Sequence, residues 1–115
     1  IKDYEFQNYE IIIKLDIEGN EISAIQGSLE LIEKSSPLII IEFSKYIFDK
    51  QDNIEYLKRF LIRYDYSIYD TNSRKRELED ILIKLTNLEK KYQTIGNFYL
   101  IKNSSKILGD FLSYE

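Results

Sequence analysis

The chain has 115 residues, enough for one domain with one modest hydrophobic core. Its net charge of −4 and its pI near 5.0 argue against a nucleic-acid-binding protein, because phosphate binding needs a basic face. No apolar run approaches the roughly 20 residues that span a bilayer, and we find no secretory signal, so we expect a cytoplasmic protein without a membrane partner.

Residues 10–16 predict the first strand. Positions 11–13 are all isoleucine and Leu15 follows, a pattern typical of a parallel strand that is buried on both faces. Apolar residues then recur at helical spacing, at Ile22, Ile25, Leu29 and Ile32. This spacing predicts one helix from a cap at Asn20 to about Lys34. We expect Gly27 to let this helix lie close to the sheet.

Residues 38–43 predict a second buried strand, which ends in the carboxylate of Glu42. Strand, helix and strand in this order form a βαβ unit, so the two strands should be parallel. A loop over 44–51 and a capping box of Asp52 and Glu55 should then lead into a helix that reaches Tyr64.

The remaining elements are shorter. A third strand is predicted over 66–70, a turn over 94–96, a last strand over 97–102 and a terminal amphipathic segment over 107–112. A third helix is marked by Leu78, Ile81, Leu82, Leu85, Leu88 and Tyr92. The basic triplet at 74–76 is interpreted as a solvated loop rather than a phosphate site.

The first βαβ unit resembles the C-terminal half of FkbM-type methyltransferases. That family has an apolar strand followed by K-x-D-x-E-G-x-E, matched here by Lys14, Asp16, Glu18, Gly19 and Glu21. The family's later features, namely a helical glycine, a strand-ending carboxylate and a final N-x-x-x-I-K strand, are matched by Gly27, Glu42, Asn97, Ile101 and Lys102. The resemblance covers roughly residues 9–102.

The resemblance implies a fold and an activity. The fold is α/β, half of a Rossmann-like methyltransferase fold in one domain over 1–115. Its mixed sheet of about four strands would run in the order 10–16, 38–43, 97–102, 66–70, with 97–102 antiparallel between its neighbours and helices on both faces. The activity is O-methyl transfer from S-adenosylmethionine to a hydroxyl of a sugar or secondary metabolite.

The cofactor-binding features of that family have no counterpart here. The glycines stand at 19, 27, 96 and 109, too far apart for a G-x-G loop. We therefore expect this chain alone to be inactive. The chain has no Met and begins at Ile1, so we expect a processed product or part of a longer protein.

In the family topology Asp16, Glu18, Glu42 and Asn97 gather along one edge of the sheet. The three carboxylates would then position a substrate hydroxyl or accept its proton, and Asn97 would bind substrate. Two alternatives remain for the carboxylates. Asp16 and Glu18 would simply cap the following helix and offset its dipole, or the carboxylate cluster would hold Mg²⁺ or Ca²⁺, although the sequence lacks His and the spacing of a calcium loop.

A rival hypothesis treats the chain as a non-catalytic, truncated remnant that acts as a structural or protein-interaction domain. In the complete family fold, strand 10–16 pairs with a further strand that we do not find in this sequence. Without that neighbour it leaves an open apolar edge, which is a template for pairing with another chain. We therefore expect a homo-oligomer, most simply a two-fold dimer, or association with a missing N-terminal half.

Overall fold

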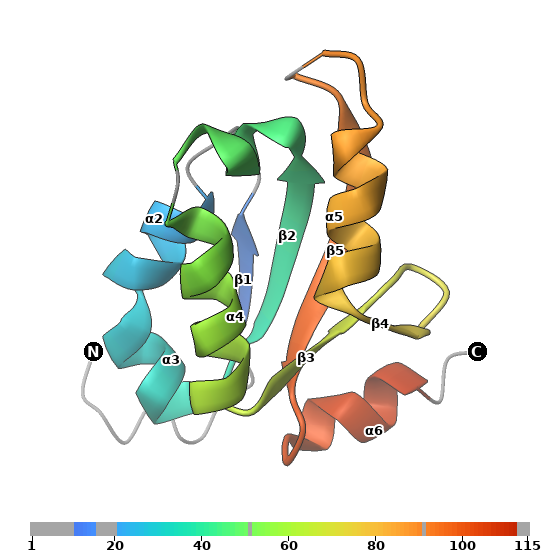
Figure 1. The fold of residues 1–115 in the computed structure, drawn as a ribbon. Helices are drawn as coiled ribbons and strands as arrows, with labels where there is room; N and C mark the ends of the chain where they lie inside the picture. Colours follow the sequence, from blue (N-terminus) through green and yellow to red (C-terminus); the bar gives the residue numbers. More distant parts are fainter. Residues whose placement is uncertain (1–10, 16–20, 51, 91, 113–115) are drawn as a thin grey trace.

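The computed structural model describes residues 11–15, 21–50, 52–90 and 92–112 (Figure 1). In chain order its elements are β1 (Ile12–Leu15), α2 (Glu21–Gly27), α3 (Leu29–Ser35), β2 (Leu38–Ser44), the 3₁₀ helix η1 (Lys45–Asp49), α4 (Asn53–Arg63), β3 (Tyr66–Tyr69), β4 (Lys75–Arg76), α5 (Leu78–Thr86), β5 (Thr94–Lys102) and α6 (Lys106–Leu112).

The strands form one mixed sheet in the order β1-β2-β5-β3-β4. β1 and β2 are parallel, and β5 runs antiparallel between β2 and β3. The predicted order and directions of the four main strands are thus confirmed. The sheet gains a fifth strand, β4, because residues 70–76 fold into a hairpin that pairs Ile68 with Arg76 and Tyr69 with Lys75.

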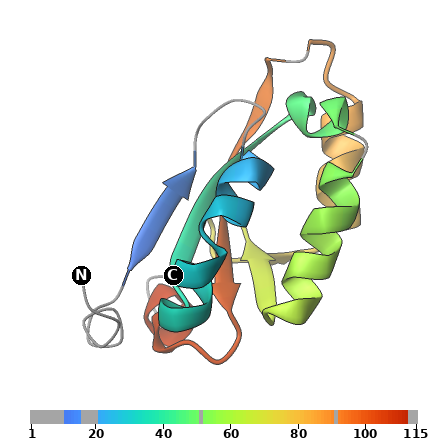
Figure 2. The ribbon, with the colours of Figure 1, turned by 90° about the vertical axis from the view of Figure 1, so that its left-hand side faces the viewer.

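The two faces of the sheet carry separate apolar layers, because side chains alternate along each strand. One layer contains Ile39, Ile41 and Phe43 of β2 and packs against α2, α3, α4 and α5. The other contains Leu38 of β2 and Ile101 of β5 and packs against α6. Figure 2 shows α4 and α5 on one side of the sheet and α6 on the other, as expected for helices on both faces.

β1 is less buried than the isoleucine run predicts. Leu15 is buried and Ile13 packs against the larger core, but Ile12 is 61% exposed. β1 is the end strand of the described sheet. Ile12 and Lys14 lie on the face of the sheet that α6 packs against, but α6 contacts β2, β3 and β5 rather than β1. Burial on both faces is therefore wrong for β1 but correct for β2, whose Leu38, Ile39 and Ile41 are all buried.

The first predicted helix is interrupted. It forms two helices of seven residues, α2 and α3, separated at Ser28. The proposed cap Asn20 lies outside the described residues. Gly27 is exposed, and a Cβ built there would meet no atom within 4 Å, so the expected close approach to the sheet is wrong.

Other boundaries also differ from the sequence expectations. The capping box is wrong, because Asp52 makes no side-chain cap to α4, and the loop over 44–51 contains η1. α5 ends at Thr86, although Leu88 still packs against the core beyond it, whereas Tyr92 is 56% exposed. The apolar pattern continues past the helix because the loop itself contributes to the core.

A β-bulge replaces the turn predicted over 94–96. Glu42 pairs with Asn97 and Ser44 pairs with Thr94, so the one intervening residue of β2, Phe43, faces two residues of β5, Ile95 and Gly96. Gly96 has a φ of +92°, in the range that favours glycine. Gly96 thus allows the bulge in the β2–β5 pairing and does not form a turn that reverses the chain.

Alanine at Gly96 and at Gly27 should change stability in opposite directions. Neither new Cβ meets an atom within 4 Å, so only the backbone effect remains. Gly96→Ala should destabilise by about 1 kcal/mol or more because of its positive φ, whereas Gly27→Ala in α2 should stabilise by up to about 1 kcal/mol. Equilibrium urea unfolding measures both, and a shift of the same sign in both variants would contradict this account of the bulge.

Candidate functional site

The candidate site lies at the edge of the sheet where β1 and β2 end, the upper edge in Figure 1. β5 begins at the same edge, because it runs antiparallel to β2. Two of the four proposed site residues lie here within the described chain, Glu42 on β2 and Asn97 on β5. Asp16 and Glu18 follow β1 in the sequence but lie outside the described residues.

Glu42 and Asn97 are direct cross-strand neighbours in the β2–β5 ladder. Paired residues on adjacent strands project to the same face, so the carboxylate and the carboxamide lie side by side. Both residues are partly exposed. The bulge begins immediately after this pair, and it therefore fixes which residues of β5 face the end of β2. The sequence prediction that these two residues meet is consistent with this register.

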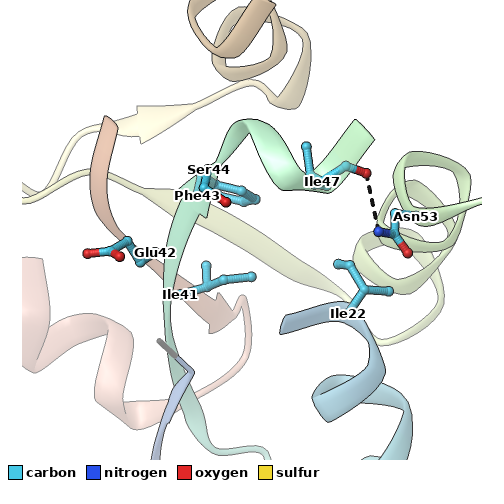
Figure 3. Close-up of a pocket in the computed structure, with 7 residues that line it drawn as sticks. All are labelled: Ile22, Ile41, Glu42, Phe43, Ser44, Ile47 and Asn53. Carbon is cyan, nitrogen blue, oxygen red and sulfur yellow. Dashed lines mark hydrogen bonds between the residues drawn. The ribbon is translucent and has the colours of Figure 1, made fainter. Parts of the chain in front are cut away.

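A small cavity lies on the opposite face of β2, lined by Ile22, Ile41, Glu42, Phe43, Ser44, Ile47 and Asn53. Figure 3 shows the carboxylate of Glu42 pointing away from the other lining side chains. The cavity holds only about 10 Å³, about the space of one water molecule. It is too small for a substrate or a nucleoside, so it belongs to the packing of the domain.

Asn53 is a buried polar residue beside this cavity. Its Nδ2 donates a hydrogen bond of 3.2 Å to the carbonyl oxygen of Ile47, drawn dashed in Figure 3. The bond ties the first turn of α4 to η1. Nearby, Lys45 Nζ donates a hydrogen bond of 2.6 Å to the carbonyl oxygen of Leu88. The sequence analysis missed both residues, because neither stands in a motif that predicts a bond to these carbonyl oxygens.

Asp70 organises the hairpin that contains the basic triplet. Its Oδ1 accepts from the backbone N–H groups of Asn72 and Arg74, and its Oδ2 accepts from Arg76 Nε at 2.7 Å. Burial raises the pKa of Asp70, but these hydrogen bonds and the charge of Arg76 outweigh it and leave the pKa below its ordinary value. Arg76 therefore stabilises the hairpin. The interpretation of the triplet as a solvated loop is wrong for Lys75 and Arg76, because they form β4 and Arg76 is partly buried.

The buried tyrosine at the other end of the sheet also has a structural role. Tyr66 Oη donates a hydrogen bond of 2.8 Å to the carbonyl oxygen of Pro37, and burial raises the pKa of Tyr66 above its ordinary value. The phenol thus stays neutral at physiological pH. It cannot serve as a base there.

Within the described part of the chain, no group of three or more His, Cys, Asp and Glu side chains is placed to hold a metal ion. The carboxylates of Asp16 and Glu18, on which the metal hypothesis depends, are not among these residues. The described helices include none that is long and apolar enough to cross a membrane.

A mixed α/β sheet with an antiparallel strand inserted between parallel ones, flanked by helices, is consistent with part of a Rossmann-like fold. A model of the methyltransferase FkbM domain matches residues 2–68, more than half of the chain. The chain therefore belongs to the FkbM methyltransferase domain family. No curated protein and no solved structure matches it.

The match covers the βαβ unit and runs on to β3. It thus includes Asp16, Glu18 and Glu42, and β5 with Asn97 lies beyond it. The family is one of methyltransferases, whose general methyl donor is S-adenosylmethionine.

Asn53→Ala should destabilise the fold by about 1–3 kcal/mol, because the buried carbonyl of Ile47 loses its hydrogen-bond donor. Asn72→Ala is the matched control: Asn72 is exposed, and the bond that it makes to Asp70 comes from its backbone N–H. We expect the control to stay within about 0.5 kcal/mol of the parent chain in chemical unfolding. Equal losses in the two variants would mean that the Asn53–Ile47 bond adds nothing.

Proposed function

We propose that this chain supplies the substrate edge of an S-adenosylmethionine-dependent O-methyltransferase, with a hydroxyl of a sugar or secondary metabolite as the acceptor. The observation that carries the proposal is the side-by-side placement of Glu42 and Asn97 where the parallel strands β1 and β2 end. Ligands of open α/β sheets bind at this edge. Membership of the FkbM family supplies the reaction class.

In this proposal each residue of the pair has one role. The Asn97 carboxamide hydrogen-bonds the acceptor sugar or metabolite and orients its hydroxyl. The Glu42 carboxylate accepts the proton of that hydroxyl as the oxygen becomes a nucleophile. Asp16 and Glu18 follow the neighbouring strand β1 in the sequence, and we propose that they help to position the same hydroxyl.

The described residues beside the end of β2 do not fit S-adenosylmethionine. The cavity beside β2 is far too small for a nucleoside, and the glycines are too scattered for a phosphate-type or nucleoside-binding loop. We therefore propose that the cofactor is held by another part of the complete fold. The open side of β1, where Ile12 is 61% exposed, supports this: in the described sheet it is an unpaired strand edge.

The same exposed edge favours a second candidate, a non-catalytic interaction domain. An unpaired strand edge with an apolar residue as exposed as Ile12 can bind a strand from a second chain as readily as a strand from the rest of the fold. The form of this candidate is a homo-oligomer through β1, which requires no methyl transfer. A complex with the cofactor-binding half belongs to the enzyme proposal instead.

Isothermal titration calorimetry of this chain with S-adenosylmethionine tests where the cofactor is held. We expect no binding in the micromolar range, because the backbone N–H groups of a glycine-rich loop are lacking. S-adenosylhomocysteine serves as a second probe, since it lacks the sulfonium charge. A micromolar dissociation constant for either one would place a cofactor site in this chain and contradict the proposal.

Substitutions in an active, complete form test the roles of the carboxylates. Glu42→Gln should lower kcat by about 10²–10⁴-fold while leaving cofactor affinity unchanged, because it removes a proton acceptor. Glu79→Gln, on the exposed first turn of α5, is the matched control and should have no effect. Asp16→Asn should slow methyl transfer more than it weakens cofactor binding. The reverse pattern would assign Asp16 to the cofactor, and an unchanged kcat in Glu42→Gln would remove Glu42 from the reaction.

A further inference from the structure

One face of the sheet is covered by the described helices only in part. Among them, α6 alone packs against this face, through Ile107, Leu108 and Phe111. Figure 1 shows α6 near the lower end of the sheet, whereas β1 and β2 end at the upper edge. The described helices therefore leave the upper part of this face uncovered, beside the candidate site.

Four partly exposed side chains lie on this upper part of the face. Glu42 and Asn97 are cross-strand neighbours, and Ile40 and Tyr99 are the next pair of the same ladder that projects to this face. Side chains two residues apart on a strand project to the same side, about 7 Å from each other. The polar pair thus lies nearer the sheet edge and the apolar pair directly below it. We name these four residues the acceptor surface.

The Tyr99 ring is held in place by its neighbours on the same face. Its centroid lies 5.1 Å from that of Phe111 on α6. The Phe111 ring also contacts Tyr69, at 5.7 Å, and Tyr69 is the cross-strand partner of Tyr99 in β3. A ring packed in this way loses little further freedom when a ligand binds. The part of the Tyr99 ring that remains exposed is therefore a preformed apolar surface.

The polar pair has unused hydrogen-bonding capacity. Within the part of the chain that the structure describes, neither the Glu42 carboxylate nor the Asn97 carboxamide forms a hydrogen bond or an ion pair. Figure 3 shows the Glu42 carboxylate pointing away from the side chains on the other face of β2. A carboxylate offers two acceptor oxygens, and a carboxamide offers one acceptor and two N–H donors. Two adjacent hydroxyls of a ligand can use both groups, because each hydroxyl donates once and also accepts.

We propose that the acceptor surface binds a pyranose ring, with Tyr99 as an acceptor-binding residue. The negative face of an aromatic ring attracts C–H groups, and a pyranose presents C–H groups on the flat side of its ring. A pyranose that lies on Tyr99 and Ile40 directs its hydroxyls toward Glu42 and Asn97. The inference rests on the proposed methyl transfer and narrows its acceptor to a sugar.

The same arrangement disfavours a flat phenolic acceptor. A phenol stacks on Tyr99 as readily as a sugar does, but it has one hydroxyl to share between two polar side chains. Either the Glu42 carboxylate or the Asn97 carboxamide then has no partner on the ligand. A ligand that leaves a polar group of the site unpaired binds more weakly than one that pairs it.

An NMR titration of this chain tests whether the surface binds a sugar. The probes are the methyl pyranosides of glucose, galactose and mannose, with phenol for comparison. We expect at least one pyranoside to bind in the millimolar range, since a monosaccharide on an open surface buries little area. Its binding should shift the backbone amide signals of Ile40, Glu42, Asn97 and Tyr99.

Three outcomes of this titration would overturn the proposal. The first is that no pyranoside shifts these signals, and the second is that phenol alone shifts them. The third is that the signals shift when the protein concentration rises without any sugar, which would make this face a contact between copies of the chain.

Substitutions assign the binding to the Tyr99 ring. Tyr99→Leu keeps an apolar contact with Phe111 but removes the flat ring, so the dissociation constant should rise at least about tenfold, which is about 1.4 kcal/mol. Tyr99→Phe keeps the ring and should stay within about threefold of the parent chain. Tyr92→Leu is the matched control, because Tyr92 is a 56% exposed tyrosine before β5, and it should change nothing.

Thermal unfolding followed by circular dichroism shows whether each variant is folded. If Tyr99→Leu does not fold, Ile40→Thr tests the same surface, and it should weaken binding at least about threefold. A folded Tyr99→Leu variant that binds the pyranoside as tightly as the parent chain would remove Tyr99 from the site.

Kinetics of an active, complete form separate this inference from the proposed methyl transfer. Tyr99→Leu should raise the KM for a pyranoside acceptor at least about tenfold with kcat within about threefold, because stacking is equal in the ground and transition states. Pyranoside binding without methyl transfer would contradict the proposed function and leave the sugar site standing. Methyl transfer to an acceptor that is not a sugar, unaffected by Tyr99→Leu, would do the reverse.

Discussion

The structure depends on β2 being apolar on both faces. Leu38, Ile39 and Ile41 are all buried, and they project alternately into two separate layers. The helices α2 to α5 cover one face and α6 covers the other because β2, together with β3 and β5, has apolar residues for each. Full burial of each such side chain stabilises the fold by about 1.5–3 kcal/mol. β2 therefore contributes stability to both apolar layers. On the face that α6 covers, the apolar series ends at Glu42, and the candidate site begins there.

The order of the strands was predictable from two sources, a local sequence pattern and the family resemblance. Parallel pairing of β1 with β2 follows from a βαβ pattern that any sequence of this form would show. The insertion of β5 between β2 and β3 is a long-range choice, and it came from the family resemblance, since nothing local in residues 97–102 specifies its neighbours. The burial of β1 was mispredicted because an isoleucine run shows that a strand is apolar but not which neighbours it has.

For the candidate site, the sequence was enough to choose the residues but not to predict how they are arranged. Glu42 and Asn97 were chosen from a motif, and their pairing depends on a register that the bulge at Gly96 adjusts. Glycine at that position is as compatible with a turn as with a bulge, so the sequence does not distinguish them. Asn53 and Lys45 were missed because their partners are carbonyl oxygens, which every residue carries and no sequence pattern reveals.

The position of β5 has a consequence for the order in which the molecule can form. It joins the β1–β2 pair to the β3–β4 hairpin, and it comes last among the strands in the sequence. During synthesis the earlier strands emerge as two separate pieces, with one edge of β2 and one edge of β3 unpaired until residues 94–102 are available. Nascent chains that stop short of this strand therefore expose unpaired edges of the buried strands β2 and β3, and they are the species that chaperones should retain.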